Sequence, residues 1–241
     1  MKVFVIGCGR SGTHWLGRGI GSHPDFVALI EQQPMFGMVQ QMAWDASLIP
    51  THIDPLVALY RRTHDEVRPR HLADKSHSNL WLVDELNARL PDAWFVAIRR
   101  KLFGTVASML RHDGVLRHFK TWDSAPGRNR FLGVEDVDAY RRLSLEERCA
   151  QRVIGSWREI DRLQTASSAK LHVIEYGTLL VDSVLEASRL ARFLGVKDAF
   201  TFATAASDQG EKWRAVLSDE QIDRIASFAT SNDAAHLLEQ G

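Results

Sequence analysis

The feature that most constrains the fold is a continuous apolar run that ends in a glycine-rich loop. Residues 3–6 read VFVI and stop at Gly7. A run of this kind is typical of a strand buried on both faces of a parallel sheet. The loop that follows, GCGRSGTH over residues 7–14, leads into a helix expected from Thr13 to about Ile20. Backbone N–H groups at such a junction, with the helix dipole behind them, predict an anion-binding site.

Further strands and helices alternate along the chain. We expect strands over residues 26–30, 71–73, 94–98 and 171–174, and helices over residues 79–90 and 184–193. Ser218 and Gln221 form a capping-box pattern ahead of a helix near the carboxyl end of the sequence. This alternation predicts an α/β fold with three layers, in which a mostly parallel central sheet is flanked by helices. Ligands bind such sheets at the carboxyl ends of the strands.

Composition excludes several classes of protein. The 241 residues are 45% hydrophobic, and we expect one globular domain over residues 1–241. Because 30 basic residues balance 30 acidic ones, a nucleic-acid partner is not expected. Cys8 and Cys149 are too few for a disulfide scaffold or a zinc site, and no metal is expected. With no apolar stretch long enough for a signal peptide or a membrane span, we expect a cytoplasmic protein.

The glycine loop allows two interpretations, of which the first is a dinucleotide site. Gly7, Gly9 and Gly12 have the G-x-G-x-x-G spacing, and Glu31 follows Gly12 by 19 residues. In a Rossmann domain an acidic residue at that distance binds the ribose of the dinucleotide. A Rossmann-type oxidoreductase is therefore the alternative function.

The second interpretation is a phosphate-binding loop that carries its own cation. Arg10 offers a bidentate guanidinium, and Ser11 and Thr13 offer hydroxyl groups. A nucleotide-triphosphatase loop would have lysine after Gly12 and then serine or threonine, whereas this chain has Thr13 and His14. An ATPase or a kinase is disfavoured for that reason.

The phosphate interpretation becomes specific over residues 9–16. The sequence GRSGTHWL is similar to the 5′-phosphosulfate loop of the P-loop sulfotransferases, usually written [KR]-S-G-T-T-W-L, with His14 in place of the second threonine. The resemblance implies a P-loop-type fold and 3′-phosphoadenosine-5′-phosphosulfate as the donor. It assigns the contacts with the 5′-phosphosulfate to six loop residues: Gly9, Arg10, Ser11, Gly12, Thr13 and His14.

A second motif follows the strand expected over residues 94–98. Residues 100–108, RKLFGTVAS, resemble the family's 3′-phosphate site, R-[DN]-P-x-x-x-x-x-S, with Lys101 and Leu102 as departures. The donor carries an isolated 3′-phosphate, and a guanidinium with a hydroxyl at a strand–helix junction can clamp it. The resemblance therefore assigns Arg100 and Ser108 to the 3′-phosphate.

Two later segments resemble the family less closely. Residues 173–179 and 193–196 are similar to its YEDL…FLGV stretch, which adds Tyr176 to the donor contacts. Residues 210–213, GEKW, match the second half of the late G-x-x-G-x-W region, with Ser207 in place of the first glycine. In the family this region closes over the nucleotide, so Lys212 and Trp213 are also expected at the donor.

The resemblance implies a sulfuryl transfer from the donor to a hydroxyl or an amine. Arg10 and Lys75 would stabilise charge on the bridging oxygen. Glu31 lies 21 residues after Arg10, like the base of tyrosylprotein sulfotransferases, and is favoured. His77, in Lys75-Ser76-His77, resembles the histidine base of cytosolic sulfotransferases and has an ordinary pKa of about 6.5, which suits proton abstraction. Asp74 is a third candidate for the base.

The acceptor has no recognisable motif. A carbohydrate, a peptide, a lipid and a small alcohol all stay open, as does the oligomeric state. Residues 32–70 and 113–148 lie between the donor motifs, and we expect them to shape the acceptor pocket. Because His14, Lys101 and Leu102 depart from the family patterns, a catalytically inactive nucleotide-binding module is a further alternative.

Overall fold

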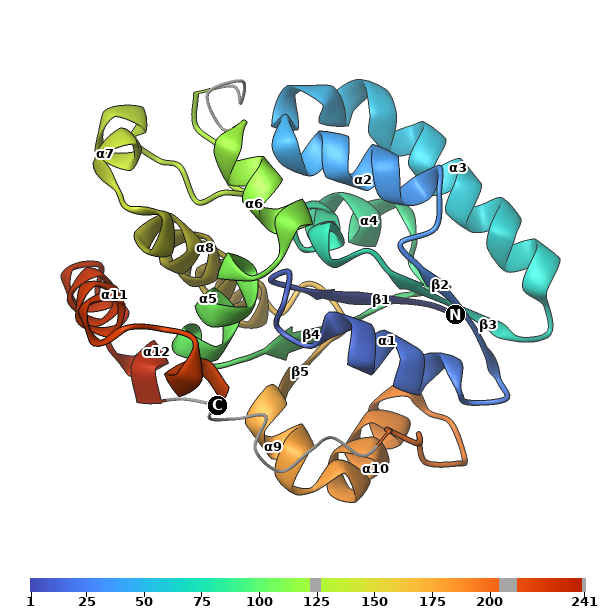
Figure 1. Ribbon diagram of the computed structural model, residues 1–241. Coiled ribbons are helices and arrows are strands. Elements are labelled where there is room, and N and C mark those ends of the chain that lie inside the picture. Colours follow the sequence, from blue (N-terminus) through green and yellow to red (C-terminus); the bar gives the residue numbers. More distant parts are fainter. Residues whose placement is uncertain (122–126, 204–211, 240–241) are drawn as a thin grey trace.

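A five-stranded parallel sheet forms the centre of the molecule (Figure 1). The computed structural model describes residues 1–121, 127–203 and 212–239. Each of the five expected strands is present, and the α/β prediction is confirmed. The strands are β1 (Lys2–Gly7), β2 (Phe26–Ile30), β3 (His71–Lys75), β4 (Ala93–Arg99) and β5 (Leu171–Glu175).

The strand order excludes the dinucleotide interpretation. The order is β2-β3-β1-β4-β5, so β1 lies between β3 and β4. In a Rossmann domain β2 is the neighbour of β1, and its acidic end reaches a ligand on the first loop directly. Here β3 separates the two strands, and a Rossmann-type oxidoreductase does not fit the fold. The chain runs from β1 to one side of the sheet and returns to the other side at β4, which makes the carboxyl ends of these two strands a switch point for ligand binding.

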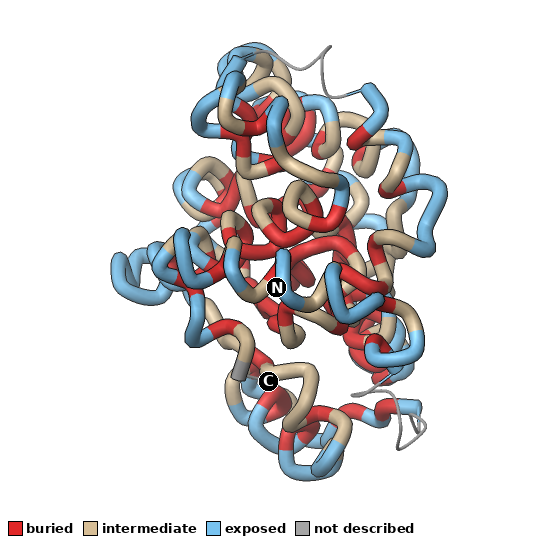
Figure 2. Tube along the Cα trace, turned by 60° about the vertical axis from the view of Figure 1, so that its left-hand side comes forward, coloured by how far each residue is buried: buried red, intermediate tan, exposed pale blue. Residues whose placement is uncertain are grey.

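Helices cover both faces of the sheet. The side chains of β1 alternate between two apolar clusters: Val3 and Val5 lie on one face, and Phe4 and Ile6 lie on the other. All four are completely buried, and Figure 2 shows this buried centre. One face carries α1 (Thr13–Gly21), α9 (Tyr176–Val181) and α10 (Ser183–Leu194). The other carries α2 (Met35–Trp44), the short η1 (Ala46–Leu48), α3 (Ile49–Val67), the 3₁₀ helix η2 (His77–Leu82) and α4 (Val83–Arg89).

A further group of helices packs into a third apolar cluster, to the left of the sheet in Figure 1. Its longest member, α8, begins at a capping box formed by Ser144 and Glu147. The group consists of α5 (Leu102–Leu110), α6 (Asp113–Lys120), α7 (Val137–Arg142), α8 (Leu145–Ala166), η5 (Lys212–Ala215), α11 (Asp219–Ser231) and α12 (His236–Glu239).

The expected helices are confirmed with one difference. The helix over residues 184–193 is α10 and ends at Gly195, and the capping box of Ser218 and Gln221 starts α11. The first half of the helix expected over residues 79–90 is instead the 3₁₀ helix η2. The Asn79 amide there donates to the Asp74 carboxylate at 2.8 Å, and this bond fixes the tighter turn directly after β3.

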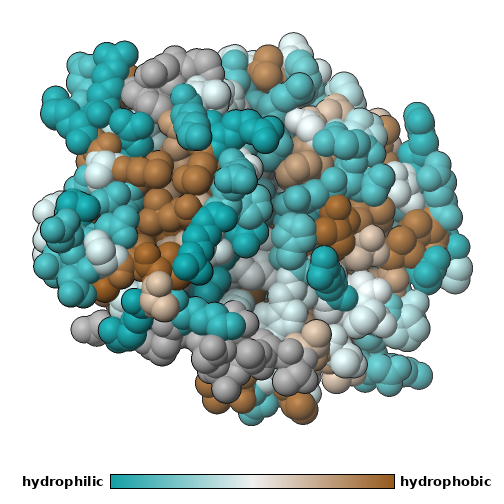
Figure 3. All heavy atoms as spheres, viewed as in Figure 1, coloured by the Kyte–Doolittle hydropathy of each residue, from teal (hydrophilic) through white to brown (hydrophobic). Residues whose placement is uncertain are grey.

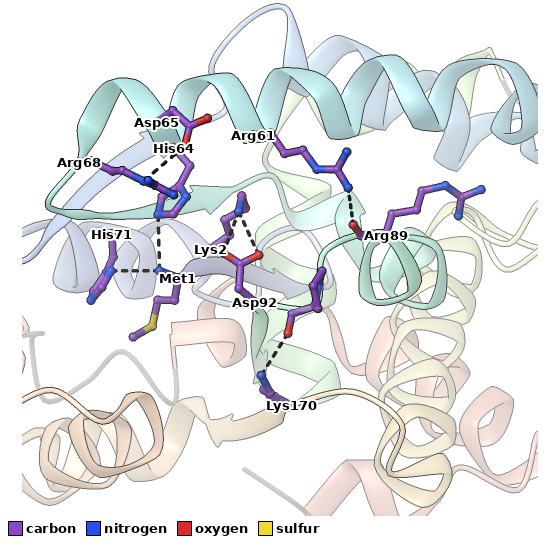
Figure 4. A network of polar contacts seen from close by, with 11 residues as sticks. Met1, Lys2, Arg61, His64, Asp65, Arg68, His71, Arg89, Asp92 and Lys170 are labelled. Carbon is purple, nitrogen blue, oxygen red and sulfur yellow. Dashed lines mark hydrogen bonds and ion pairs between the residues drawn. The ribbon is translucent and has the colours of Figure 1, made fainter.

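Polar contacts link the residues at the amino ends of the strands (Figure 4). These ends lie opposite the glycine loop, which follows the carboxyl end of β1. Lys2 Nζ forms an ion pair with Asp92 at 2.8 Å, and the Met1 amino group contacts His71 Nδ1 at 3.1 Å and His64 Nε2 at 3.5 Å. These bonds join residues that are 63 to 90 positions apart in sequence. The amino ends therefore have a structural role, and the predicted ligand-binding residues lie at the opposite ends.

The surface carries apolar residues in patches, which are brown in Figure 3. Val181, Val184 and Leu185 are the exposed apolar side chains at the junction of α9 and α10. Among the described residues, no helix combines the length and the apolar character that crossing a membrane requires.

Candidate active site

The loop after β1 has the tight shape that an anion cradle requires. Gly12 has a φ of 103°, and a Cβ at this position would lie 2.6 Å from a ring carbon of Tyr176, so only glycine fits. The Ser11 hydroxyl donates to the Cys8 carbonyl at 2.7 Å and lies 3.2 Å from the Ile98 carbonyl, which fastens the loop to β4. The Ser11 hydroxyl therefore stabilises the shape of the loop through contacts with backbone carbonyls.

Two cavities meet at this loop. The first, which we term the Arg100 cavity, has a volume of about 200 Å³ and is lined by Arg10, Gly12, Thr13, His14, Trp15, Arg100, Ser108 and Tyr176. The second, the Glu31 cavity, has a volume of about 240 Å³ and is lined by Gly9, Arg10, Thr13, His14, Glu31, Phe36, Gln40, Lys75, His77, His112, Gly114, Val115, His118 and Arg152. Arg10, Thr13 and His14 belong to both, so the cavities are two sides of one loop.

The Arg100 cavity brings together the cations and hydroxyls of the two phosphate motifs. Arg10 Nε donates to Ser108 Oγ at 3.1 Å, and Arg100 Nη1 donates to the Arg10 carbonyl at 3.3 Å. The Arg100 guanidinium lies 4.6 Å from the centre of the Tyr176 ring, which positions it by a cation–π contact. Helix α5 begins at Leu102, the position where proline stands in the family pattern and where proline favours a helix start. The departure from proline therefore leaves the strand–helix junction in place.

The Glu31 cavity contains a carboxylate held by three donors. Strands β2 and β3 pair with Ile30 opposite Lys75, so Glu31 emerges beside the lysine. Glu31 Oε1 accepts a hydrogen bond from Lys75 Nζ and another from His77 Nδ1 at 3.3 Å, and it lies 3.4 Å from His14 Nε2. No described residue donates to Glu31 Oε2. That oxygen is therefore available to a ligand in the cavity.

These contacts determine the charges in the Glu31 cavity. Burial alone would raise the pKa of Glu31, but hydrogen bonds from His14, His77 and Lys75 overcome it and hold the pKa well below its usual value. Burial lowers the pKa of Lys75, and the contact with Glu31 opposes this shift. Burial also lowers the pKa of His77 to about 4, so its ring is neutral at pH 7. The cavity thus holds an ionised carboxylate beside a neutral imidazole.

Backbone strain coincides with two of these residues. Arg10 has a φ of 75° and Glu31 a φ of 52°, in the left-handed region that non-glycine residues rarely adopt. Such conformations cost about 1–3 kcal/mol each and persist where the surrounding structure holds them. Strain at a cation and at a carboxylate that face the same cavity points to a functional arrangement of both.

Other predicted residues lie elsewhere. Asp74, the third candidate for the base, is buried and accepts hydrogen bonds from Tyr60 and Asn79; burial raises its pKa to about 6. It lines neither cavity and holds η2 in place instead. Trp213 stacks on Phe103 with ring centres 4.7 Å apart, in the third apolar cluster. Neither Lys212 nor Trp213 lines either cavity, and residues 210 and 211 of the same motif lie outside the described residues.

Several residues that line the Glu31 cavity belong to no motif that the sequence shows. Phe36, Gln40 and His118 come from the two segments expected to shape an acceptor pocket, but they were not named individually. Arg152 was missed altogether, because helix α8 was not predicted. A signal was present: Arg152 falls between Cys149, Val153 and Ser156 on the buried face of α8. A charged residue on the buried, mostly apolar face of a helix indicates a functional residue or one that is paired with an opposite charge.

The neutral state of His77 predicts a pH-dependent stability. The unfolded His77 takes up a proton below pH 6.5, but in the folded protein its pKa is about 4. Unfolding therefore binds a proton between these values, and stability falls as the pH drops, by up to about 3 kcal/mol for a shift of this size. We expect urea unfolding at pH 5 and pH 7 to show a smaller difference for His77→Gln than for the wild type. An equal difference in both proteins would show that His77 is not held neutral.

Comparison with known proteins identifies the family. The model of the sulfotransferase family matches residues 2–200, and the chain belongs to that family. No curated protein sequence matches the chain. The protein is a sulfotransferase, as the resemblance of the loop after β1 implied.

Solved structures confirm the fold. The sulfotransferase domain from the curacin biosynthetic pathway is 15% identical with a TM-score of 0.64, over 95% of this chain and 96% of that one. The sulfotransferase from Alicyclobacillus acidocaldarius is 16% identical with a TM-score of 0.61, over 99% and 96%. Mouse sulfotransferase SULT7A1, solved in complex with PAP, is 13% identical with a TM-score of 0.54, over 99% and 87%. At these identities the likeness concerns the fold.

Proposed function

We propose that this sulfotransferase, acting as one domain over residues 1–241, transfers a sulfuryl group from 3′-phosphoadenosine-5′-phosphosulfate to a hydroxyl of its acceptor. The donor binds in the Arg100 cavity and the acceptor in the Glu31 cavity. The observation that carries this proposal is the shared wall of the two cavities, formed by Arg10, Thr13 and His14. A sulfuryl group bound at that wall can be reached by the donor from the Arg100 cavity and by the acceptor from the Glu31 cavity, as an in-line transfer requires.

The Arg100 cavity suits a donor with two separate phosphates. Arg100 and Ser108 supply a guanidinium and a hydroxyl for the 3′-phosphate, and Tyr176 and Trp15 supply aromatic surface for the nucleoside. The loop from Gly9 to His14 supplies backbone N–H groups and the Arg10 side chain for the 5′-phosphosulfate. The PAP bound in the mouse structure belongs to the same class of nucleotide.

In the reaction a bond forms between the acceptor oxygen and sulfur, and the bond between sulfur and the 5′-phosphate oxygen breaks. Adenosine 3′,5′-bisphosphate leaves with the electron pair of the broken bond. Arg10 and Lys75 stabilise the charge that develops on the leaving oxygen, as fixed cations do in related group transfers. The acceptor proton goes to Glu31.

Two arguments support Glu31 as the base: its side chain is more accessible to an acceptor than that of His77, and the reaction requires only a weak base. Its side chain is 27% exposed, whereas that of His77 is 12% exposed and its Nε2 atom is buried. The low pKa of Glu31 makes it a weak base in the resting site. However, the acceptor proton becomes strongly acidic once its oxygen bonds to sulfur, so a weak base that is always ionised suffices. His77 and His14 would orient the carboxylate by their hydrogen bonds.

Transfer from a sulfur-labelled donor to a panel of acceptors tests this function. The panel should cover carbohydrates, tyrosine peptides, lipids and small alcohols, and we expect a labelled product from one of these classes. Arg10→Ala should abolish the labelled product, whereas Arg158→Ala, on an exposed face of α8, should not. Equal product from Arg10→Ala and wild type would contradict the proposed transfer at the loop.

A further inference from the structure

We propose that Arg152 forms a binding subsite for an anionic group of the acceptor, so that the acceptor is a hydroxylated organic acid: a carboxylate, phosphate or sulfate. This inference rests on the proposed function, because it takes the Glu31 cavity as the acceptor side. Its starting point is a buried cation that lines this cavity without a counter-charge. Arg152 is only 3% exposed, and its Nη1 atom is buried with no hydrogen-bond partner.

A second buried arginine, Arg99, differs because protein groups accept hydrogen bonds from its guanidinium, although its Nε atom is also buried without a hydrogen-bond partner. Arg99 is 8% exposed, and its guanidinium donates to Asp161 and Gln164. The Arg152 side chain forms no ion pair within residues 1–121, 127–203 and 212–239. A buried charge costs several kcal/mol unless it is paired. An anionic ligand that pairs with the guanidinium would offset this cost.

The surroundings of Arg152 hold the guanidinium in place but do not neutralise it. Its carbon Cζ lies 4.0 Å from the centre of the Phe131 ring, a cation–π contact that positions the group. Gly9 leaves room beside it, since a Cβ there would lie 3.3 Å from both Arg152 Nη2 and His77 Nε2. The rings of His77 and His118 each have a pKa lowered by burial to about 4, so neither adds charge at pH 7.

The position of Arg152 places the anion on the acceptor side. Arg152 lines the Glu31 cavity and not the Arg100 cavity, where Arg10 and Arg100 already supply cations for the donor. Glu31 is the one carboxylate that lines the Glu31 cavity within the described residues, and Lys75 pairs with it. Since Arg10 and Lys75, which also line the Glu31 cavity, are assigned to the transferred group, the guanidinium of Arg152 is the remaining cation of this cavity and the one that we assign to the acceptor.

A neighbouring hollow indicates what else the acceptor contains. It has a volume of about 260 Å³, shares Gln40 and His118 with the Glu31 cavity, and is walled by Trp44 and Phe131. The rings of Trp44 and Phe131 contact each other, with their centres 6.1 Å apart and their planes at 60°, and together form one aromatic side of the hollow. Aromatic walls favour a flat apolar or aromatic body. We therefore expect the acceptor to combine an aromatic or similarly flat part with an anionic group close to its hydroxyl.

Calorimetry with small probes tests the subsite in the presence of saturating adenosine 3′,5′-bisphosphate. The probes are benzoate and phenyl phosphate, which distinguish the two kinds of anion, and neutral benzyl alcohol at matched ionic strength. We expect at least one anion to bind the wild type and benzyl alcohol to bind more weakly. Arg152→Gln should weaken binding of that anion about 10- to 100-fold, the range for a lost charge-assisted hydrogen bond. Arg152→Lys should recover part of the loss.

The matched control is Arg158→Gln, an exposed arginine on the same helix, which should bind the anion as the wild type does. The proposal is overturned if neither anion binds the wild type better than benzyl alcohol. It is also overturned if Arg152→Gln weakens the bisphosphate and leaves the anion unaffected, because Arg152 would then belong to the donor site. Absence of bisphosphate binding in the wild type would instead count against the proposed function, and the anion titration alone would still test Arg152.

Discussion

Glu31→Gln is expected to lower kcat about 10²- to 10⁴-fold, the usual range for removal of a general base. The amide cannot accept the acceptor proton at the position of Glu31 Oε2. It also cannot serve as the ionised partner of Lys75, His77 and His14. Because the Arg100 cavity does not include Glu31, the affinity for adenosine 3′,5′-bisphosphate should stay close to that of the wild type.

Steady-state kinetics and bisphosphate titrations of the same protein preparation separate these two effects. A thermal melt is needed as well, because the substitution leaves the buried Lys75 without its ionised partner. His77→Asn is the informative companion variant, since His77 donates to Glu31 at 3.3 Å and should affect turnover less than Glu31→Gln does. Unchanged turnover in Glu31→Gln, together with loss of turnover in His77→Asn, would assign the base to histidine.

Lys75→Met is expected to lower kcat about 10²- to 10³-fold, as loss of one fixed donor for transition-state charge does in other enzymes. Lys75 ends β3 with a side chain that is 1% exposed, and methionine is an apolar residue of similar length. Because the substitution leaves the Glu31 carboxylate without its cation, it should also lower stability, by about 3–5 kcal/mol where such a pair is buried, so turnover must be normalised to the folded fraction. The loss should appear in kcat, and the affinity for the bisphosphate should fall as well, because the leaving oxygen that Lys75 is proposed to stabilise stays on this product.

The matched control for this variant is Lys170→Met. Lys170 is exposed and donates to the Pro91 carbonyl at 3.2 Å, at the amino ends of the strands. The Lys170→Met variant should retain the turnover of the wild type. If Lys75→Met loses activity only in proportion to a loss of folded protein, as measured by circular dichroism, Lys75 has a structural role and not a catalytic one.

Local sequence patterns predicted the strands and the donor motifs because the causes are local. A buried apolar run makes β1, a glycine with positive φ makes the loop, and Ser218 with Gln221 starts a helix. These signals lie within a few residues of the structure that they specify. The order of the strands is not local, and it was the observation that excluded the dinucleotide interpretation.

The contacts that the sequence did not reveal join residues distant along the chain. Glu31 and Lys75 are 44 positions apart and meet because β2 pairs with β3. Arg152 belongs to α8, which is far from the glycine loop in sequence. Only the packing of α8 in the folded protein brings the Arg152 guanidinium close to Gly9. Trp213, from the motif that predicted a nucleotide contact, packs its ring on Phe103 in the third apolar cluster, and its contact with the donor stays a prediction.

Calorimetry with adenosine 3′,5′-bisphosphate and adenosine 5′-monophosphate tests most directly whether the donor binds in the Arg100 cavity. We expect the wild type to bind the bisphosphate about 10- to 100-fold more tightly, because Arg100 and Ser108 hold the 3′-phosphate. Arg100→Ala should remove most of this preference and leave the affinity for the monophosphate nearly unchanged. Equal affinities for the two nucleotides in the wild type would contradict the assignment of the Arg100 cavity to the donor.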